Sequence, residues 1–397
     1  MEFVAREELS QRTHALQEKL RRGELDGVLL MQNVDIFYFT GTAQNGILFI
    51  PSSGEPLFMV KKSVTRARIE SPLDQVVPLE SVRKAPDLIQ SHGHRVDGRF
   101  GMELDVLPVS LYDRTRKAFG NASIVDASGL VREVRASKSP YEIEMMRKAA
   151  GQLAAGFDAL RTAIREGMRE IDICAQLEGI LRREGHQGIV RARRWNMELW
   201  YGAVSAGASA SYPISFEGPV GVTGLYPAVP QSGGERHVNA GEPIVIDIVG
   251  GHGGYLVDKT RIFCIGEPDA ALRELYEFAL TVERHIEERL RPGNVPGDIY
   301  DETIELVAET PYADHFMGWD ENRVGFVGHG IGLEIDELPV LAHGFDAPLE
   351  TGMTVAVEPK FFYPDTGGVG IEDTYVVTAT GCEKLTEYPT EMIIVPG

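Results

Sequence analysis

The sequence predicts two domains, an α/β domain over residues 1–134 and a larger α+β domain over residues 135–397. Three observations support this division. The chain has 397 residues, which is long for a single hydrophobic core. Short apolar runs alternate with helical patterns in the first part, whereas helices and strands occur in separate runs in the second part. A strong helix start near residue 139 lies between the two patterns.

The first domain is predicted to alternate helices and strands. The apolar run of residues 26–31 (DGVLLM) is typical of a buried strand. Two apolar runs separated by Pro51 and Gly54 have the pattern of a β-hairpin. The complete prediction is a helix over residues 7–23, a strand over 26–31, a helical turn over 33–38, a hairpin over 47–60, and strands over 100–102 and 123–126 with a helix between them.

The second domain is predicted to begin with a long helix. Ser139, Pro140 and Glu142 are an N-cap, a first-turn proline and a capping-box glutamate. Apolar residues then recur every three or four positions up to Ile164, which gives the helix one buried face. Residues 202–240 are rich in Gly, Ser and Pro, and we expect a long functional loop there. The other elements are expected as helices over about 170–184, 268–290 and 296–309 and as strands over about 353–358 and 370–378.

Charge and composition restrict the partners and the compartment. The formal net charge of −20 argues against nucleic acid or an anionic membrane as a partner, because both would be repelled. The three cysteines form no CxxC pair, which suits a reducing compartment. The charged N-terminus lacks the pattern of a signal peptide, and no apolar run reaches the length of a membrane span. We therefore expect a cytoplasmic protein.

The segment VIDIVGGHGGYLVDKTR, residues 245–261, is predicted to be a β-hairpin with an aspartate on each strand. Asp247 and Asp258 interrupt runs that are otherwise apolar, and a buried carboxylate is costly unless it is paired or bound to a metal. Two such carboxylates facing each other would repel, and a cation between them removes the repulsion. The alternative, one turn aspartate and one salt bridge to Lys259 or Arg261, remains open on this segment alone.

Further residues of the kind that bind metals follow toward the C-terminus. Glu358 ends the strand pattern TVAVEP, and Glu372 lies in the apolar run GIEDTYVV. His329 lies between glycines in GHGIGLEIDELP, where the backbone can approach a bound group closely. Four carboxylates and one imidazole suit manganese, cobalt, iron or zinc. We therefore predict a site for two divalent metal ions per chain.

These motifs, in this order and spacing, resemble those of the pita-bread metallopeptidase family, which includes Xaa-Pro dipeptidases and aminopeptidases, prolidases and creatinase. The resemblance covers nearly the whole chain. The N-terminal region resembles the creatinase-type domain, and RASKSPYEIEMMRKAA resembles the junction helix. The resemblance implies a creatinase-type α/β N-terminal domain, an α+β pita-bread catalytic domain, and a homodimer.

The resemblance also implies a role for each ligand. Asp247 would hold the first ion. Asp258 and Glu372 would bridge both ions, and His329 with Glu358 would complete the second site. A water between the ions would be acidic enough to attack a carbonyl near neutral pH. Glu358 would carry a proton from that water to the leaving nitrogen.

Two positions depart from the family pattern. Asp336 stands where family peptidases carry a histidine that contacts the substrate, and Gln231 stands near the place of a second such histidine. An ionised Asp336 accepts hydrogen bonds but cannot donate them, so we expect it to act as a base or to attract a cationic group. Arg193 and Arg194 either clamp a substrate carboxylate or form a solvated basic face.

The function predicted from these residues is that of a dinuclear metal-dependent hydrolase of the Xaa-Pro dipeptidase or aminopeptidase type, acting on a small peptide. The alternative is a related non-peptidase enzyme that acts on a small molecule through a C–N or C–S bond, because the histidines are replaced at Asp336 and Gln231. The complete ligand set argues against a binding protein without catalysis.

Overall fold

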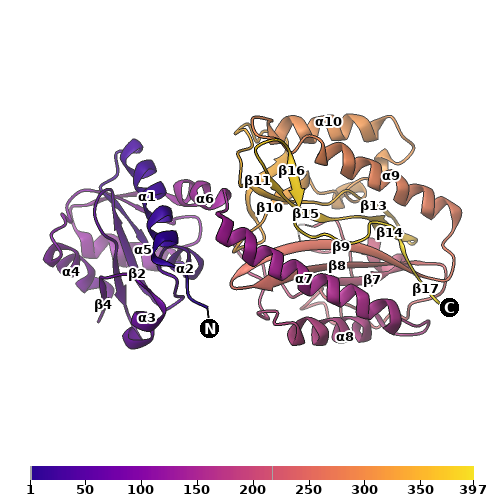
Figure 1. Ribbon diagram of the computed structural model, residues 1–397, viewed down its shortest axis with the longest axis horizontal. Helices are drawn as coiled ribbons and strands as arrows, with labels where there is room; N and C mark the ends of the chain where they lie inside the picture. The colour runs from indigo at the N-terminus through magenta and orange to yellow at the C-terminus, as the bar shows by residue number, and fades with distance from the viewer. Residues whose placement is uncertain (1, 217) are drawn as a thin grey trace. The chain divides into compact units, whose positions relative to one another are not determined.

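The chain forms two compact units, which divide between Arg135 and Ala136 (Figure 1). The computed structural model describes residues 2–216 and 218–397. The sequence placed the division between residues 134 and 135. Among the described residues, no helix combines the length and the apolar character that crossing a membrane requires.

The first unit is an α/β arrangement around a mixed sheet. In spatial order its strands are β4 (Val76–Pro78), β3 (Leu57–Val60), β2 (Gly46–Pro51), β1 (Gly27–Leu30), β5 (Arg99–Met102) and β6 (Ser123–Asp126). β1 pairs antiparallel with β2 and parallel with β5, and all of its residues are buried. The helices are α1 (Arg6–Arg22), α2 (Asn33–Thr40), α3 (Val64–Glu70), α4 (Ala85–Ser91), α5 (Val109–Phe119) and α6 (Ser128–Ala136), with a 3-10 turn η1 (Val82–Lys84). The helices and strands predicted for this region are confirmed.

The second unit combines helices with sheets that are mostly antiparallel. One sheet has the order β11 (Glu337–Ala342), β10 (Phe326–Gly330), β12 (Thr354–Val357), β15 (Asp373–Val377) and β16 (Cys382–Lys384). Another has the order β17 (Ile393–Val395), β9 (Tyr255–Ile265), β8 (Pro243–His252) and β7 (Gly202–Ala206). β13 (Lys360–Tyr363) pairs with β14 (Gly367–Gly370). The helices are α7 (Pro140–Ala163), α8 (Glu170–Arg183), α9 (Ala270–Glu287) and α10 (Pro296–Ala308), with 3-10 turns η2 (Gly207–Ser211), η3 (Ala313–His315) and η4 (Asp320–Asn322).

The long helix α7 begins at the predicted capping box. Ser139 Oγ accepts a hydrogen bond from the amide of Glu142 at 3.2 Å, and Glu142 Oε2 accepts one from the amide of Ser139 at 2.9 Å. The helix packs along β8 and β9 (Figure 1). Gly250 permits this approach, because a Cβ there would lie 2.6 Å from the carbonyl oxygen of Ala149. α7 therefore supports the hairpin that carries two of the predicted ligands.

Two parts of the second unit differ from the sequence prediction. Residues 202–240, predicted to be a long loop, begin with β7, which pairs with β8 from Gly202 to Ala206. Its small residues carry little strand signal of their own, and pairing with a neighbouring strand decides their conformation. Glu372, predicted to lie inside a strand, stands just before β15 and forms an isolated bridge with Thr260 of β9.

Candidate metal centre

The five predicted ligands converge from the two larger sheets of the second unit. Asp247 lies on β8, Asp258 on β9 and His329 on β10. Glu358 directly follows β12, and Glu372 directly precedes β15. Because β10 pairs with β12 and β12 pairs with β15, these positions are brought side by side. Their ligand atoms form two overlapping groups, in each of which the atoms lie within 4.8 Å of one another.

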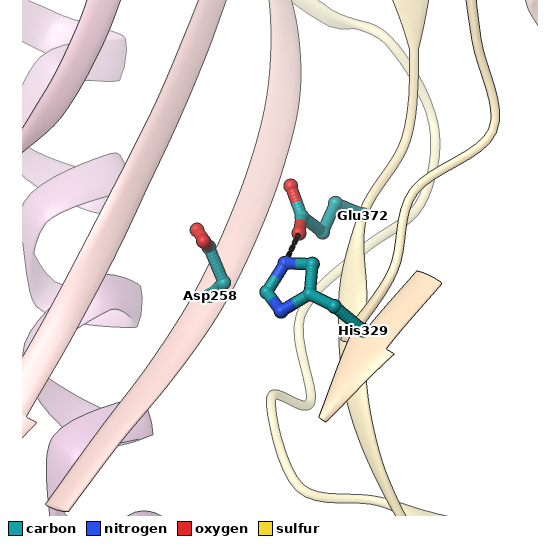
Figure 2. A group of neighbouring side chains, drawn as sticks. All are labelled: Asp258, His329 and Glu372. Carbon is teal, nitrogen blue, oxygen red and sulfur yellow. Dashed lines mark ion pairs between the residues drawn. The ribbon is translucent and has the colours of Figure 1, made fainter. Parts of the chain in front are cut away.

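The first group, which we call the histidine group, consists of Asp258, His329 and Glu372. Figure 2 shows the imidazole of His329 directed toward Glu372, with Nε2 3.9 Å from Oε1. Within residues 2–216 and 218–397, the buried Glu372 Oε1 accepts no hydrogen bond. A buried carboxylate oxygen without a donor is costly, and a cation satisfies it. The histidine group therefore fits one divalent ion that prefers oxygen and nitrogen ligands.

Burial and crowding of acids affect protonation in the histidine group. Burial, and then the charge of Asp247, raise the pKa of Asp258 well above its ordinary value. Burial, and then the charge of Asp258, raise the pKa of Glu372 well above its ordinary value. Both shifts arise because carboxylates are confined together away from water, and a cation bound between them favours the ionised forms.

The second group consists of Asp247, Glu358 and Glu372, and we call it the lysine group because it surrounds the ammonium of Lys360. Lys360 Nζ lies 2.7 Å from Glu358 Oε2 and 2.8 Å from Glu372 Oε2. It lies 3.2 Å from Asp247 Oδ2, and the residue is 0% exposed. Burial opposes the charged form, but the carboxylates outweigh it and raise the pKa of Lys360 well above its ordinary value. The lysine group therefore already holds a cation.

Strand geometry explains why Lys360 points into the site. In an extended segment, residues two apart project to the same face, so Lys360 follows the direction of Glu358. β13 pairs with β14 so that Lys360 lies opposite Gly370. A Cβ on Gly370 would lie 2.4 Å from Lys360 Cγ, so the glycine leaves the space that the lysine stem occupies. Sequence reasoning missed Lys360, and its spacing of two from a predicted ligand was the signal that could have found it.

A buried charge cluster fixes the backbone next to Glu372. Asp373 is fully buried and accepts hydrogen bonds from Lys259 Nζ, Arg261 Nη2 and Lys384 Nζ, at 2.6, 2.9 and 2.7 Å. Arg261 also donates to the carbonyl oxygen of Glu372 at 3.0 Å. Lys259 and Arg261, which the sequence left as alternative partners for the hairpin aspartates, pair with Asp373 instead.

Asp336 and Gln231 were predicted to contact substrate. Both form hydrogen bonds with the backbone of the segment between α8 and β7. Asp336 accepts hydrogen bonds from the backbone amides of Arg193 and Arg194, at 2.7 and 2.8 Å. Gln231 accepts one from the amide of Trp200 at 3.2 Å and donates one to a carbonyl of the same segment. These contacts order the backbone of the segment. A catalytic role for Asp336 and a substrate contact by Gln231 stay predictions.

The two arginines predicted to clamp a substrate differ in exposure. Arg194 is exposed, whereas Arg193 is buried. Arg193 Nη1 lies 3.7 Å from Glu334 Oε2, and both side chains are buried. Arg193 therefore has an acidic partner inside the protein, and the substrate clamp stays a prediction for both arginines.

The same segment is anchored near its start by a buried histidine. His186 is 2% exposed, and its Nε2 donates to the carbonyl of Val249 at 3.1 Å. Its Nδ1 accepts from the amide of Gly188 at 2.9 Å. This pair of contacts requires the neutral imidazole with its proton on Nε2. Burial lowers the pKa of His186 to about 4.

Comparison with known proteins covers both units. The family described as Metallopeptidase family M24 matches residues 144–379, and the Creatinase/Prolidase N-terminal domain matches residues 12–137. The Uncharacterized peptidase YqhT of Bacillus subtilis is 28% identical over 386 residues, which cover 95% of this chain and 99% of that protein. The Xaa-Pro dipeptidase of Pyrococcus furiosus is 24% identical over 387 residues, which cover 97% of this chain and 100% of that protein. Among solved structures, the Xaa-Pro dipeptidase from Bacillus anthracis has a TM-score of 0.82 and 26% identity, and the match covers 98% of this chain and 100% of that one.

Proposed function

Because this chain belongs to metallopeptidase family M24 and is therefore a metal-dependent hydrolase, we propose that it cleaves Xaa-Pro dipeptides. The membership also confirms the predicted fold class, a creatinase-type N-terminal domain followed by a pita-bread catalytic domain. The observation that carries the proposal is the histidine group, where Asp258, His329 and Glu372 converge. Relatives named Xaa-Pro dipeptidase support the substrate class, since the similarity spans nearly the full length of both chains.

The residues around the histidine group support hydrolysis of an amide bond. A divalent ion held there would supply an acidified water and would polarise the substrate carbonyl. Glu358 Oε1 lies 3.6 Å from His329 Nε2, and this short distance to a predicted metal ligand supports a role for the carboxylate in proton transfer. We assign Glu358 the transfer of a proton from the water to the leaving proline nitrogen. Lys360 donates to Glu358 Oε2 at 2.7 Å and so orients the carboxylate for this transfer.

The number of metal ions per chain and the number of chains in the assembly are separate from the proposed activity. The five-ligand pattern predicts two ions of manganese, cobalt, iron or zinc, whereas the hydrolysis proposed here requires only the ion of the histidine group. A homodimer and a cytoplasmic location stay predictions from the sequence.

The experiment is a dipeptidase assay on protein that has been stripped with a chelator and reloaded with Mn²⁺ or Co²⁺. We expect proline release from Xaa-Pro dipeptides that requires the added metal and falls about 10²–10⁴-fold in Glu358→Gln. Glu267→Gln is the matched control, because Glu267 is an exposed glutamate paired with Arg273. Conversion of small C–N or C–S compounds without any proline release would overturn the proposal and favour the non-peptidase alternative.

A further inference from the structure

Lys360 is a cation built into the predicted two-ion site. We propose that its ammonium takes the place of one of the two ions, so that the chain binds a single divalent ion, at the histidine group. This inference rests on the proposed metal dependence and is independent of the substrate.

The inference that Lys360 replaces an ion depends on the position of its ammonium. Each carboxylate of the lysine group has an oxygen within 3.2 Å of Lys360 Nζ. These carboxylates, Asp247, Glu358 and Glu372, form one of the two groups whose ligand atoms lie close enough together to bind an ion. A metal bound to carboxylate oxygens lies about 2.0–2.2 Å from each of them. An ion among these oxygens would therefore occupy the space that Nζ fills.

The charges of the site favour one ion over two. Four carboxylates carry four negative charges, and Lys360 carries one positive charge. One divalent ion brings the positive charges to three and the net charge to −1, whereas a second ion would bring them to five and the net charge to +1. The total charge is equally near neutrality in both cases, but the second ion would lie beside a buried ammonium that already pairs with the same carboxylates. Buried charges require partners of opposite sign, so the second ion is disfavoured.

The lysine is held in this position by its surroundings. It is 0% exposed, so its side chain has no direct path to water. Its carbonyl oxygen accepts a hydrogen bond from the amide of Met317 at 2.8 Å, and its strand pairs with Gly370. A Cβ on Gly370 would also lie 2.7 Å from Lys360 Cα. These contacts fix the backbone that carries Lys360, and the three carboxylates hold the ammonium at the end of its side chain.

The first test counts ions in wild type and in Lys360→Ala, which removes the ammonium and opens the space around it. Metal-free protein is loaded with excess Mn²⁺ or Co²⁺, separated from free metal, and analysed for metal per chain. We expect one ion in wild type and two in Lys360→Ala. Lys138→Ala is the matched control, because Lys138 is also a buried lysine, with Nζ 2.9 Å from Glu337 Oε2 outside both groups. The control should bind one ion.

A second test needs no variant, so it holds even if Lys360→Ala does not fold. Crystals of wild type grown with Mn²⁺ should show one anomalous scattering peak, at the histidine group, and none in the lysine group. Two peaks, two ions per wild-type chain, or an unchanged count in Lys360→Ala would overturn the inference. A wild type without any ion would defeat the metal dependence as well, whereas one ion without dipeptidase activity would defeat only the proposed substrate.

Discussion

The buried carboxylate of Asp373 offers a direct test of what holds the site together. Burial opposes its ionisation, but Arg261, Lys259 and Lys384 outweigh burial and hold the pKa of Asp373 well below its ordinary value. Asp373→Asn removes the negative charge and keeps the size of the side chain. The surrounding cations would then repel one another inside the protein, with Glu283, 3.4 Å from Lys384 Nζ, as a remaining acidic neighbour.

The expected effect follows from the burial of this cluster. Removing one partner of a buried ion pair costs about 3–5 kcal/mol in free energy of unfolding. The asparagine oxygen still accepts a hydrogen bond, so we take the lower end, about 3 kcal/mol. At about 2–4 °C per kcal/mol for a domain of this size, the thermal midpoint should fall by about 6–12 °C. Metal affinity should fall too, because Asp373 anchors the backbone next to Glu372.

Calorimetry and urea denaturation of the chelator-treated protein measure the stability change, and metal titration measures the affinity. Glu267→Gln is the control, because it breaks a pair with Arg273 in which the side chains are 82% and 55% exposed. Exposed pairs contribute little, so the control should change stability by less than about 0.5 kcal/mol. If Asp373→Asn is destabilised no more than the control, the reasoning about the buried cluster is refuted.

Two further predictions concern the segment between α8 and β7. His186 has a pKa of about 4 in the folded protein and 6.5 as its ordinary value, so the unfolded chain binds the proton first as pH falls. Stability should therefore decline between pH 6.5 and about 4, by up to about 3 kcal/mol, and His186→Gln should remove this decline from a pH series of urea denaturations. Asp336→Ala removes the acceptor of two backbone amides and should cost about 1–3 kcal/mol. Hydrogen exchange over residues 191–200 should accelerate in that variant, and unchanged exchange would show that Asp336 does not order the segment.

Much of the fold was predictable because its signals are local. The capping box at Ser139 and Glu142 needs only residues three apart, and both of its hydrogen bonds are present. The hairpin of β8 and β9 follows from apolar runs around a glycine-rich turn. β7 was missed, because a run of small residues becomes a strand only through its pairing with β8.

The sequence by itself determined those helices and strands that have local signals, such as α7 and the hairpin of β8 and β9, and the residue types of the candidate metal centre, including Asp258, His329 and Glu372. Tertiary structure alone decided which atoms those residues meet. Asp336 reaches the amide of Arg193, which lies 143 positions away in the chain. Lys360 becomes a cation inside the site only because β8, β12 and β15 bring their carboxylates around it. The physical reason is that a buried charge is stabilised by groups close in space, and local sequence patterns do not specify which distant groups those are.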